Sequence, residues 1–228
     1  MAAPAAAPAS AKRVGSSRLK AVAGALAEYD RERSRDGRLL LGGVDEAGRG
    51  CWAGPVVAAA VVLPAGWAPA GLDDSKKLSP ARREALYTEI RAGALAWTAC
   101  AISAPEIDST DILRATLRAM SRAVARLRLT PDLLLVDGNQ VPAVTMPAES
   151  IVRGDGTSAA IAAASIIAKV LRDRVMVTWD RHYPGYGFAA HKGYGAAAHR
   201  EAIERLGPCV LHRYSYEPLA SRGQGRLF

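Results

Sequence analysis

The sequence lacks several features that would assign it to a familiar structural class. No apolar stretch approaches the ~20 residues of a membrane-spanning helix, so we expect no membrane segment. The Ala/Pro-rich start has no leading positive charge and no Leu-rich segment, which argues against a signal peptide. The only cysteines are Cys51, Cys100 and Cys209, without a CxxC pair. This odd, scattered set argues against disulfides or a zinc site and predicts a reducing, cytoplasmic location.

Other ligand-binding signatures are missing as well. The four histidines show no metal-ligand spacing, so we expect them to be surface or packing residues; they are His182, His191, His199 and His212. No Gly-rich phosphate loop with Ser or Thr near an Asp is present, which argues against a sugar-kinase-like ATPase. With 228 residues, half of them hydrophobic, the chain fits one catalytic domain with a substantial core, and we expect a monomer.

Positive charge is in excess and is concentrated at the start of the chain. The net charge is +8, and residues 1–38 carry eight Lys/Arg against four Asp/Glu, so half the excess lies there. An excess of this size suggests a polyanionic partner. We interpret residues 1–37 as a low-complexity basic extension, with a helix-like stretch around Leu19–Arg35, that is disordered or loosely docked. A solvated tail without a role is an equally good interpretation.

Two apolar runs end in acidic residues. The run 39–44 stops at Asp45 and Glu46, and the run 133–136 stops at Asp137. Short Leu/Val runs bounded by Gly, Asn and Asp are typical of buried strands. Ligands gather at the carboxyl ends of parallel strands, and charges there need neutralisation. Acidic residues also close strands as simple turn formers, but two such ends favour a site for hard divalent cations.

A glycine-rich turn follows the first acidic pair. Gly48-Arg49-Gly50 comes directly after Asp45-Glu46-Ala47, and Gly54-Pro55-Val56 follows shortly after. Glycines allow positive φ and close backbone approach, and successive N–H groups can form an anion-binding nest. The arginine adds a fork suited to phosphate. A simple turn would explain the glycines but not an arginine beside two acids.

The ordered set of motifs closely resembles the signature of bacterial ribonuclease HII, the type 2 ribonuclease H. The resemblance covers roughly residues 38–218 in unbroken order. It rests on Val44-Asp45-Glu46-Ala47-Gly48-Arg49-Gly50, Gly54-Pro55-Val56, Asp74-Ser75-Lys76-Lys77-Leu78, Val136-Asp137-Gly138-Asn139, Gly154-Asp155, the run 161–170 with Arg172-Asp173, and His191-Lys192-Gly193-Tyr194-Gly195.

The resemblance implies a fold and an activity. The fold would be α/β, a ribonuclease H-like mixed sheet flanked by helices with a small helical C-terminal region. The enzyme would hydrolyse the RNA strand of RNA–DNA hybrids and cut 5′ of single ribonucleotides in duplex DNA, leaving 3′-hydroxyl and 5′-phosphate ends, in ribonucleotide removal. Another nuclease of this fold, such as a resolvase, is the alternative. A metal-independent nucleic-acid-binding module is disfavoured because its acids would repel phosphates. Ribonuclease HIII would need a further N-terminal domain.

The periodicity of the chain predicts a mixed sheet covered by helices. Residues 38–218 would form the catalytic domain and residues 219–228 a flexible tail. We expect Ser79-Pro80 to start a helix, as N-cap and first helical residue. The expected strands are 39–45, 55–63, 95–103, 132–137 and 151–152, and the expected helices are 81–91, 109–129, 157–177 and 196–206.

Asp155 and Asp173 compete for the place of a further carboxylate. Asp155 lies just before Thr157, the expected cap of the helix 157–177, whose N-terminus favours its charge. On the residues alone it can also be no more than a helix-start residue. Asp173, eighteen residues later, would lie about 27 Å away along a helix, so both cannot serve one centre. The resemblance makes Asp155 the fourth catalytic carboxylate, and we expect Asp173 to pair with nearby arginines.

These carboxylates suggest two-metal phosphodiester hydrolysis by Mg²⁺ or Mn²⁺, the ions that oxygen-only ligands select. We expect Asp45 and Asp137 to ligate or bridge two ions, Glu46 to hold one, and Asp155 to complete the second site. Neighbouring strand residues point to opposite faces. Glu46 should therefore lie beyond the strand end or bind through the turn. In the helix that follows, Ser158, Ser165, Lys169 and Arg172 are expected to form a polar face opposite the apolar stripe.

Substrate recognition requires a group that reads the ribose 2′-hydroxyl. The backbone of Gly48-Arg49-Gly50 is the candidate beside the metals. By resemblance, Tyr194 recognises the ribonucleotide–deoxyribonucleotide junction, although a tyrosine between glycines is more often loop packing. Lys76 and Lys77 could bind flanking phosphates or could simply be solvated.

The end of the chain resembles a docking peptide. Gln224-Gly225-Arg226-Leu227-Phe228 is similar to the bacterial pentapeptide that binds the replication sliding clamp, in which Leu-Phe enters an apolar groove and Gln forms hydrogen bonds. The alternatives are a chance match and packing of Leu227 and Phe228 on the domain itself.

Overall fold

The computed structural model describes residues 10–224, with side chains for residues 21–221. Its centre is a five-stranded sheet of order β3-β2-β1-β4-β5. β2 is antiparallel to β1 and to β3, whereas β4 is parallel to both β1 and β5. The strands are β1 (Leu41–Ala47), β2 (Val56–Val62), β3 (Ala96–Ile102), β4 (Leu133–Asp137) and β5 (Ala148–Ile151).

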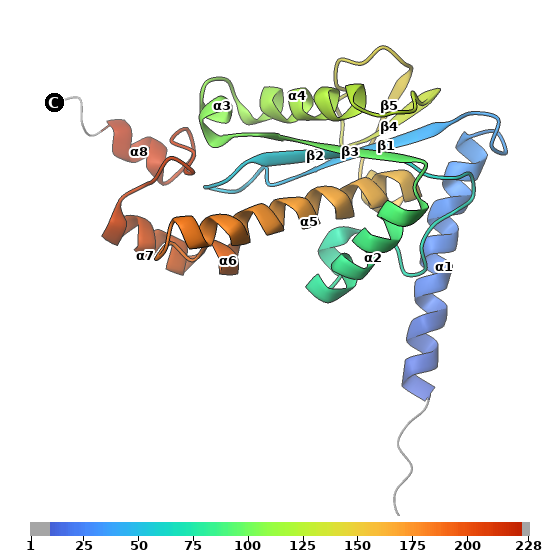
Figure 1. The fold of residues 1–228 in the computed structure, drawn as a ribbon, viewed down its shortest axis with the longest axis horizontal. Coiled ribbons are helices and arrows are strands. Elements are labelled where there is room, and N and C mark those ends of the chain that lie inside the picture. The colour runs from blue at the N-terminus through green and yellow to red at the C-terminus, as the bar shows by residue number, and fades with distance from the viewer. Residues whose placement is uncertain (1–9, 225–228) are drawn as a thin grey trace, which may run out of the picture.

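Helices cover both faces of this sheet. The long helix α5 and helix α2 cover one face, whereas α3 and α4 cover the other (Figure 1). Helices α6, α7 and α8 gather at one end, and α1 lies at the opposite end (Figure 1). The helices are α1 (Ser10–Arg33), α2 (Pro80–Gly93), α3 (Ala104–Asp108), α4 (Ile112–Ala125), α5 (Ala159–His182), α6 (Phe188–His191), α7 (Ala197–Leu206) and α8 (Leu219–Gln224), with short 3-10 turns η1 (Ser75–Lys77) and η2 (Gly154–Gly156).

The start of α5 lies directly on β1 because Gly43 has no side chain. A Cβ atom at this position would stand 2.1 Å from the carbonyl carbon of Ala160, closer than any real contact. The neighbouring strand β2 consists only of valine and alanine, and all seven of its residues are buried. Ile161, Ile166 and Ile167 of α5 are fully buried in the core. This close approach brings the start of α5 to the edge where β1 and β4 end.

The predicted sheet is confirmed, with small shifts in its boundaries. All five expected strands are present, although the last one, β5, lies earlier than the expected range 151–152. The expectation that the segments 55–63 and 95–103 both run antiparallel to the first strand is confirmed for β2 but is wrong for β3, because β3 pairs antiparallel with β2 and therefore runs in the direction of β1. Ser79 caps α2 and Pro80 is its first residue. The expected helix 109–129 is shorter, because Asp111 caps α4 at its start and the helix ends at Ala125. The separate short helix α3, with a capping box at Ser103, precedes it.

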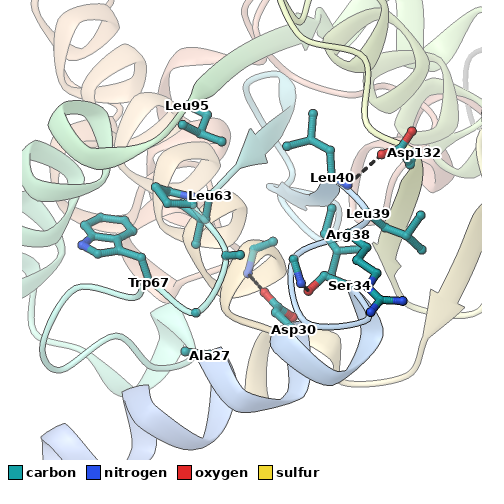
Figure 2. Close-up of a pocket in the computed structure, with 16 residues that line it drawn as sticks. Ala27, Asp30, Ser34, Arg38, Leu39, Leu40, Leu63, Trp67, Leu95 and Asp132 are labelled. Carbon is teal, nitrogen blue, oxygen red and sulfur yellow. Dashed lines mark hydrogen bonds between the residues drawn. The ribbon is translucent and has the colours of Figure 1, made fainter.

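The prediction of a loosely docked extension is wrong for residues 21–37. Ala23, Leu26 and Ala27 of α1 are buried, and Asp30 is only 9% exposed. A cavity of about 300 Å³ lies between α1 and the start of β1. Figure 2 shows the Asp30 carboxylate among the residues that line this cavity. Its Oδ2 accepts a hydrogen bond of 2.8 Å from the backbone N–H of Ala160. The second half of α1 therefore belongs to the folded domain.

The C-terminal region is also more ordered than the sequence suggested. Residues 219–224 form α8, and Leu219 is buried, so this part of the expected flexible tail is helical. Gln224 ends that helix, whereas Leu227 and Phe228 lie outside the described residues. Between residues 10 and 224, no helix has the length and apolar character needed to cross a membrane.

Candidate active site

Four acidic residues meet where β1 and β4 end, and we refer to Asp45, Glu46, Asp137 and Asp155 as the acidic cluster. Asp45 and Glu46 belong to β1, and Asp137 is the last residue of the parallel strand β4. Asp155 lies in η2, directly before α5. The Asp137 Oδ1 accepts a 2.7 Å hydrogen bond from the N–H of Gly154, which ties β4 to that turn. The expected cap at Thr157 is wrong, because Ser158 caps α5.

Glu46 reaches the cluster by a different route from the one expected. β1 continues to Ala47, so Glu46 does not lie beyond the strand end. Alternation along the strand puts Glu46 on the face covered by α4, where it lines a small cavity together with Asp137. Asp45 points to the opposite face, the one that α5 covers. The end of β4 thus lies between the two neighbouring carboxylates.

The acidic cluster is electrostatically strained at neutral pH. Burial and then the neighbouring carboxylates of Glu46 and Asp137 raise the pKa of Asp45 well above its ordinary value. Burial and the Asp155 charge likewise raise the pKa of Asp137. Burial raises the pKa of Glu46, while Arg49 partly offsets this effect. A cation in this cluster would relieve both the repulsion and the cost of burial.

Lys76 supplies one positive charge to the cluster. Its Nζ lies 3.0 Å from Asp155 Oδ2, and burial of the ammonium is more than offset by this carboxylate, so the pKa of Lys76 is raised. The segment is anchored because the hydroxyl of Ser75 meets that of Ser165 in α5 at 2.7 Å. Lys77, the other expected phosphate ligand, pairs with Asp73 at 3.2 Å instead of approaching the cluster.

The donor set of the cluster fits hard divalent cations. All four groups are carboxylates, and three of them have raised pKa values because negative charge is buried together. Among the side chains of residues 21–221, however, no three acidic, histidine or cysteine groups already stand in the geometry of a formed metal site. Two contacts partly explain why the carboxylates do not converge on one point. The Lys76 ammonium binds Asp155, and the Gly154 N–H donates to Asp137. Cation binding therefore requires some side-chain rearrangement.

The GRG turn (Gly48-Arg49-Gly50) is held from behind by Arg213. Arg213 is fully buried, and its guanidinium donates hydrogen bonds of 2.7 Å to the carbonyl groups of Gly48 and Arg49. The Tyr216 hydroxyl donates to the same Arg49 carbonyl at 2.8 Å. These contacts occupy carbonyl oxygens and leave the Arg49 side chain half exposed beside Glu46. The turn is therefore shaped by the C-terminal region, a contribution that sequence reasoning missed.

Arg172 is a second buried arginine, and here the expected polar face of α5 is wrong. Its guanidinium donates to the carbonyl groups of Ala53, Pro55 and Lys192 at 2.9–3.1 Å. A Cβ atom on Gly48 would lie 2.0 Å from Arg172 Nε, so this position of the turn requires glycine. A buried charge that is held by backbone carbonyl groups gives no periodic signal in a sequence. Asp173 pairs with Lys169 at 2.8 Å, and not with arginines as expected.

Tyr194 lies near the GRG turn and lines a groove beside it. The side chain is 42% exposed and lines a groove of about 680 Å³ with Lys169 and Lys192. Burial of the ring, followed by the adjacent Cys51 thiol, raises the pKa of the Tyr194 hydroxyl. Cys51 directly follows Gly50, so the tyrosine hydroxyl lies close to the end of the turn. Tyr194 and the GRG turn, the two candidates for recognition of the sugar, therefore lie close together.

Fold and site together define a nuclease with the ribonuclease H fold, in which acidic residues end two neighbouring parallel strands. The family model for ribonuclease HII matches residues 42–218, and the chain therefore belongs to the ribonuclease HII family. Members of this family are endonucleases that hydrolyse the RNA strand of RNA–DNA hybrids and use divalent metal ions, and this chain is such an endoribonuclease. The resolvase alternative is excluded.

Similar proteins span nearly the same length. The chain is 52% identical over 188 residues to ribonuclease HII of Syntrophotalea carbinolica, covering 82% of this chain and 90% of the relative. Ribonuclease H2 of Pyrococcus horikoshii has a similar fold, with a TM-score of 0.70 and 24% identity. The match covers 81% of this chain and 97% of that protein. Ribonuclease HII of Archaeoglobus fulgidus, solved as a complex with PCNA, superposes with a TM-score of 0.66 and is 27% identical. The match covers 78% of this chain and 96% of that protein.

Proposed function

We propose that this endoribonuclease cuts on the 5′ side of single ribonucleotides in duplex DNA as well as within RNA–DNA hybrids, and that it acts in ribonucleotide removal. The observation that carries this proposal is the position of Tyr194. Its hydroxyl lies beside Cys51, which directly follows the GRG turn, and this turn follows the acidic cluster in β1. A group that reads one sugar is thus close to the groups that serve hydrolysis.

The acidic cluster would hold two divalent ions, Mg²⁺ or Mn²⁺. Asp45 and Asp137 would ligate or bridge the ions, Glu46 would hold one, and Asp155 would complete the second site. When bound, the two ions supply an activated water and stabilise charge on the phosphoryl and leaving oxygens. Burial of the carboxylates supports this assignment, because their raised pKa values indicate negative charge that lacks a partner.

The chain's own groups would bind and orient the nucleic acid. The backbone N–H groups of the GRG turn would contact the ribose 2′-hydroxyl, and the half-exposed Arg49 would contact a phosphate. The Tyr194 ring would stack on the deoxyribose that follows. Lys76 and Lys77 would bind flanking phosphates once Lys76 leaves Asp155. The groove beside Tyr194, with Lys169 and Lys192 in its wall, would accept the continuing duplex.

The partners would include the sliding clamp, besides RNA–DNA hybrids and ribonucleotide-containing duplexes. Gln224, Leu227 and Phe228 would form the clamp ligand, and the PCNA complex of the A. fulgidus relative supports this idea for the present chain. The enzyme would act as a monomer in the cytoplasm. Clamp binding would bring it to newly copied DNA, where misincorporated ribonucleotides lie.

Carboxylate-to-amide variants test the assignment of the metal site. Asp45→Asn and Asp137→Asn each remove a ligand and reduce negative charge, so cleavage should fall by at least about 10³-fold while substrate affinity stays equal or increases. Asp173→Asn is the matched control, because Asp173 pairs with Lys169 outside the cluster. The substrates are a duplex with one ribonucleotide and a uniform hybrid.

Thermal unfolding of the free enzyme provides a second readout. Asp45→Asn should stabilise the metal-free protein at neutral pH, because the buried Asp45 charge is unfavourable there. It should also reduce the rise in melting temperature that Mn²⁺ produces. Normal turnover of both cluster variants would disprove the metal assignment. A wild-type enzyme that cuts hybrids but leaves the single-ribonucleotide duplex intact would disprove the proposed junction activity.

A further inference from the structure

Three histidines form a continuous chain beneath the loop that carries Tyr194. His191 ends α6, His199 belongs to α7, and His212 follows α7 in the C-terminal region. The rings of His191 and His199 stack with centroids 4.2 Å apart. The Nε2 atoms of His199 and His212 lie 3.2 Å apart, and both side chains are fully buried. The expectation of simple packing residues therefore omits a specific hydrogen-bonded arrangement.

The partners of His191 and His199 fix their protonation. His191 Nε2 meets the carbonyl oxygen of Tyr186 at 2.8 Å, so this nitrogen carries the proton, and Nδ1 accepts from the N–H of Gly193 at 3.1 Å. His199 Nδ1 meets the carbonyl oxygen of Tyr194 at 2.9 Å and must likewise donate. The remaining Nε2 of a neutral His199 is an acceptor.

His212 completes the chain as a donor to His199. Its Nδ1 accepts from the N–H of Cys209 at 3.0 Å and lies 3.2 Å from the Cys209 thiol. The Cys209 carbonyl oxygen also lies 3.2 Å from His212 Nδ1. Because Nε2 of the neutral His199 is an acceptor, however, the proton of a neutral His212 is on Nε2 and is donated to His199 Nε2. Burial lowers the pKa of both His199 and His212 to about 4, in agreement with a neutral pair. A second proton on either ring would bring two N–H groups face to face.

The chain joins the two loops that flank the candidate junction site. At one end, His191 and His199 bind the backbone of Gly193 and Tyr194. At the other end, His212 pairs with Ala53 in an isolated β-bridge, and the next residue, Arg213, holds the GRG turn. No other described side chain adds a third donor between the facing histidine nitrogens, so the pair does not form a metal site.

We propose that His191, His199 and His212 form an uncharged brace that fixes Tyr194 relative to the GRG turn and thereby sets the preference for a ribonucleotide–deoxyribonucleotide junction. The inference rests on the proposed function, because it requires Tyr194 to contact the junction. The three histidines are positioning residues and do not contact the substrate. Loosening the brace moves the tyrosine while the acidic cluster keeps its own supports on β1 and β4.

Substitutions at His199 distinguish the effect of losing the hydrogen-bond donor to Tyr194 from the effect of a change in side-chain size. In His199→Asn the amide N–H can replace Nδ1–H as the donor to the Tyr194 carbonyl, whereas the longer His199→Gln places its amide nearer the Nε2 position. His199→Gln and His199→Ala should lower kcat on the single-ribonucleotide duplex roughly ten- to a hundredfold, and activity on a uniform hybrid much less. His199→Asn should restore most of the junction activity. His182→Ala, an exposed position at the end of α5, is the matched control.

Failure of the proposed junction activity and failure of the histidine brace give different results. If the wild type does not cut the single-ribonucleotide duplex, the proposed function fails whatever the variants do. If the wild type cuts it, and His199→Gln loses activity equally on both substrates or on neither, the brace does not set the preference. Equal loss in His199→Asn and His199→Gln would also overturn the proposal, because the donor to Tyr194 would then have no role.

Imidazole ¹⁵N spectra of the wild type test the brace without any substitution. We expect three neutral rings at about pH 7, with the proton on Nδ1 in His199 and on Nε2 in His191 and His212. Each ring is assigned in the wild type from nuclear Overhauser contacts between its protons and the neighbouring backbone protons. A charged His199–His212 pair, or a His199 ring protonated only on Nε2, would overturn the proposal even if the kinetic variants failed to fold.

Discussion

The ammonium group of Lys76 lies 3.0 Å from the Asp155 carboxylate, at the edge of a cluster whose other acids have raised pKa values. The Lys76 side chain is 77% exposed, whereas that of Asp155 is 8% exposed. A long side chain thus reaches from solvent to neutralise a buried charge. Because the ion pair with Asp155 holds the exposed ammonium at the cluster, a cation that binds Asp155 can displace the lysine side chain.

We expect Lys76→Met to tighten binding of the first divalent cation to the free enzyme. The variant keeps the length of the side chain but removes a competing positive charge from Asp155. The pair is partly exposed, so the gain in affinity should stay below about tenfold. Calorimetric titration of the substrate-free protein with Mn²⁺ measures it. Lys77→Met is the matched control, since Lys77 pairs with Asp73; weaker Mn²⁺ binding by Lys76→Met would show that the lysine supports the site.

A change at Tyr194 should separate the two substrates. Tyr194→Ala removes both the ring and the hydroxyl, so activity on a single-ribonucleotide duplex should fall by at least roughly tenfold, and activity on a uniform hybrid by less. Tyr194→Phe keeps the ring, so its activity on the single-ribonucleotide duplex should lie between those of Tyr194→Ala and the wild type. The measurement is kcat/KM on both duplexes at saturating metal. Equal losses on both would mean that Tyr194 only maintains the loop.

Local patterns in the sequence were sufficient to predict the sheet and the acidic residues at the ends of two strands, whereas Asp155 was assigned to the cluster by the family resemblance. Leu/Val runs that end at Asp45 and Asp137 are read from neighbouring residues, and β1 and β4 have the expected character. The predicted position of Glu46 was wrong because the length of β1 depends on its pairing with β2, and this pairing continues to Ala47. No local pattern reveals such a partner.

The parts that the sequence did not reveal depend on contacts between distant segments. Arg213 holds carbonyl groups more than 150 residues earlier in the chain. Arg172 likewise holds the carbonyl group of Pro55, 117 residues earlier. A buried arginine looks like any surface arginine until its partners are known. Asp30 is similar, because its contact with Ala160 spans 130 residues. Composition indicated a solvated basic segment, whereas one buried acid and a few apolar residues dock it.

Two truncations should separate the halves of the N-terminal segment. Removing residues 1–20 deletes Lys12, Arg13, Arg18 and Lys20, so the salt dependence of substrate affinity should become shallower with little change in stability. Removing residues 1–37 also deletes the buried side chains of α1 and should cost about 3 kcal/mol or more. Chemical denaturation and binding at several salt concentrations measure both. Equal stability of the two truncated proteins would contradict the docking of α1.

Asp30 should make the stability depend on pH in a defined direction. Burial raises its pKa to about 6 in the folded state, so the folded protein binds a proton that the unfolded chain, near 3.8, does not. This contribution is present below about pH 4 and is lost as pH rises through about 6. Relative to Asp30→Asn, the wild type should therefore lose up to about 3 kcal/mol of stability between about pH 4 and about pH 7.5. A constant difference between the two proteins would contradict the raised pKa.

The end of the chain should bind the sliding clamp. Deleting Leu227 and Phe228 removes the apolar pair that would enter a groove of the clamp, so binding should fall by at least roughly tenfold. The matched control replaces Gly225 and Arg226 with alanine, because these positions separate Gln224 from the apolar pair without contributing an anchor. Fluorescence anisotropy with purified clamp measures affinity, and cleavage without clamp should be the same in all three proteins. If the intact protein and the deletion variant bind alike, or neither binds, the tail is not a clamp ligand.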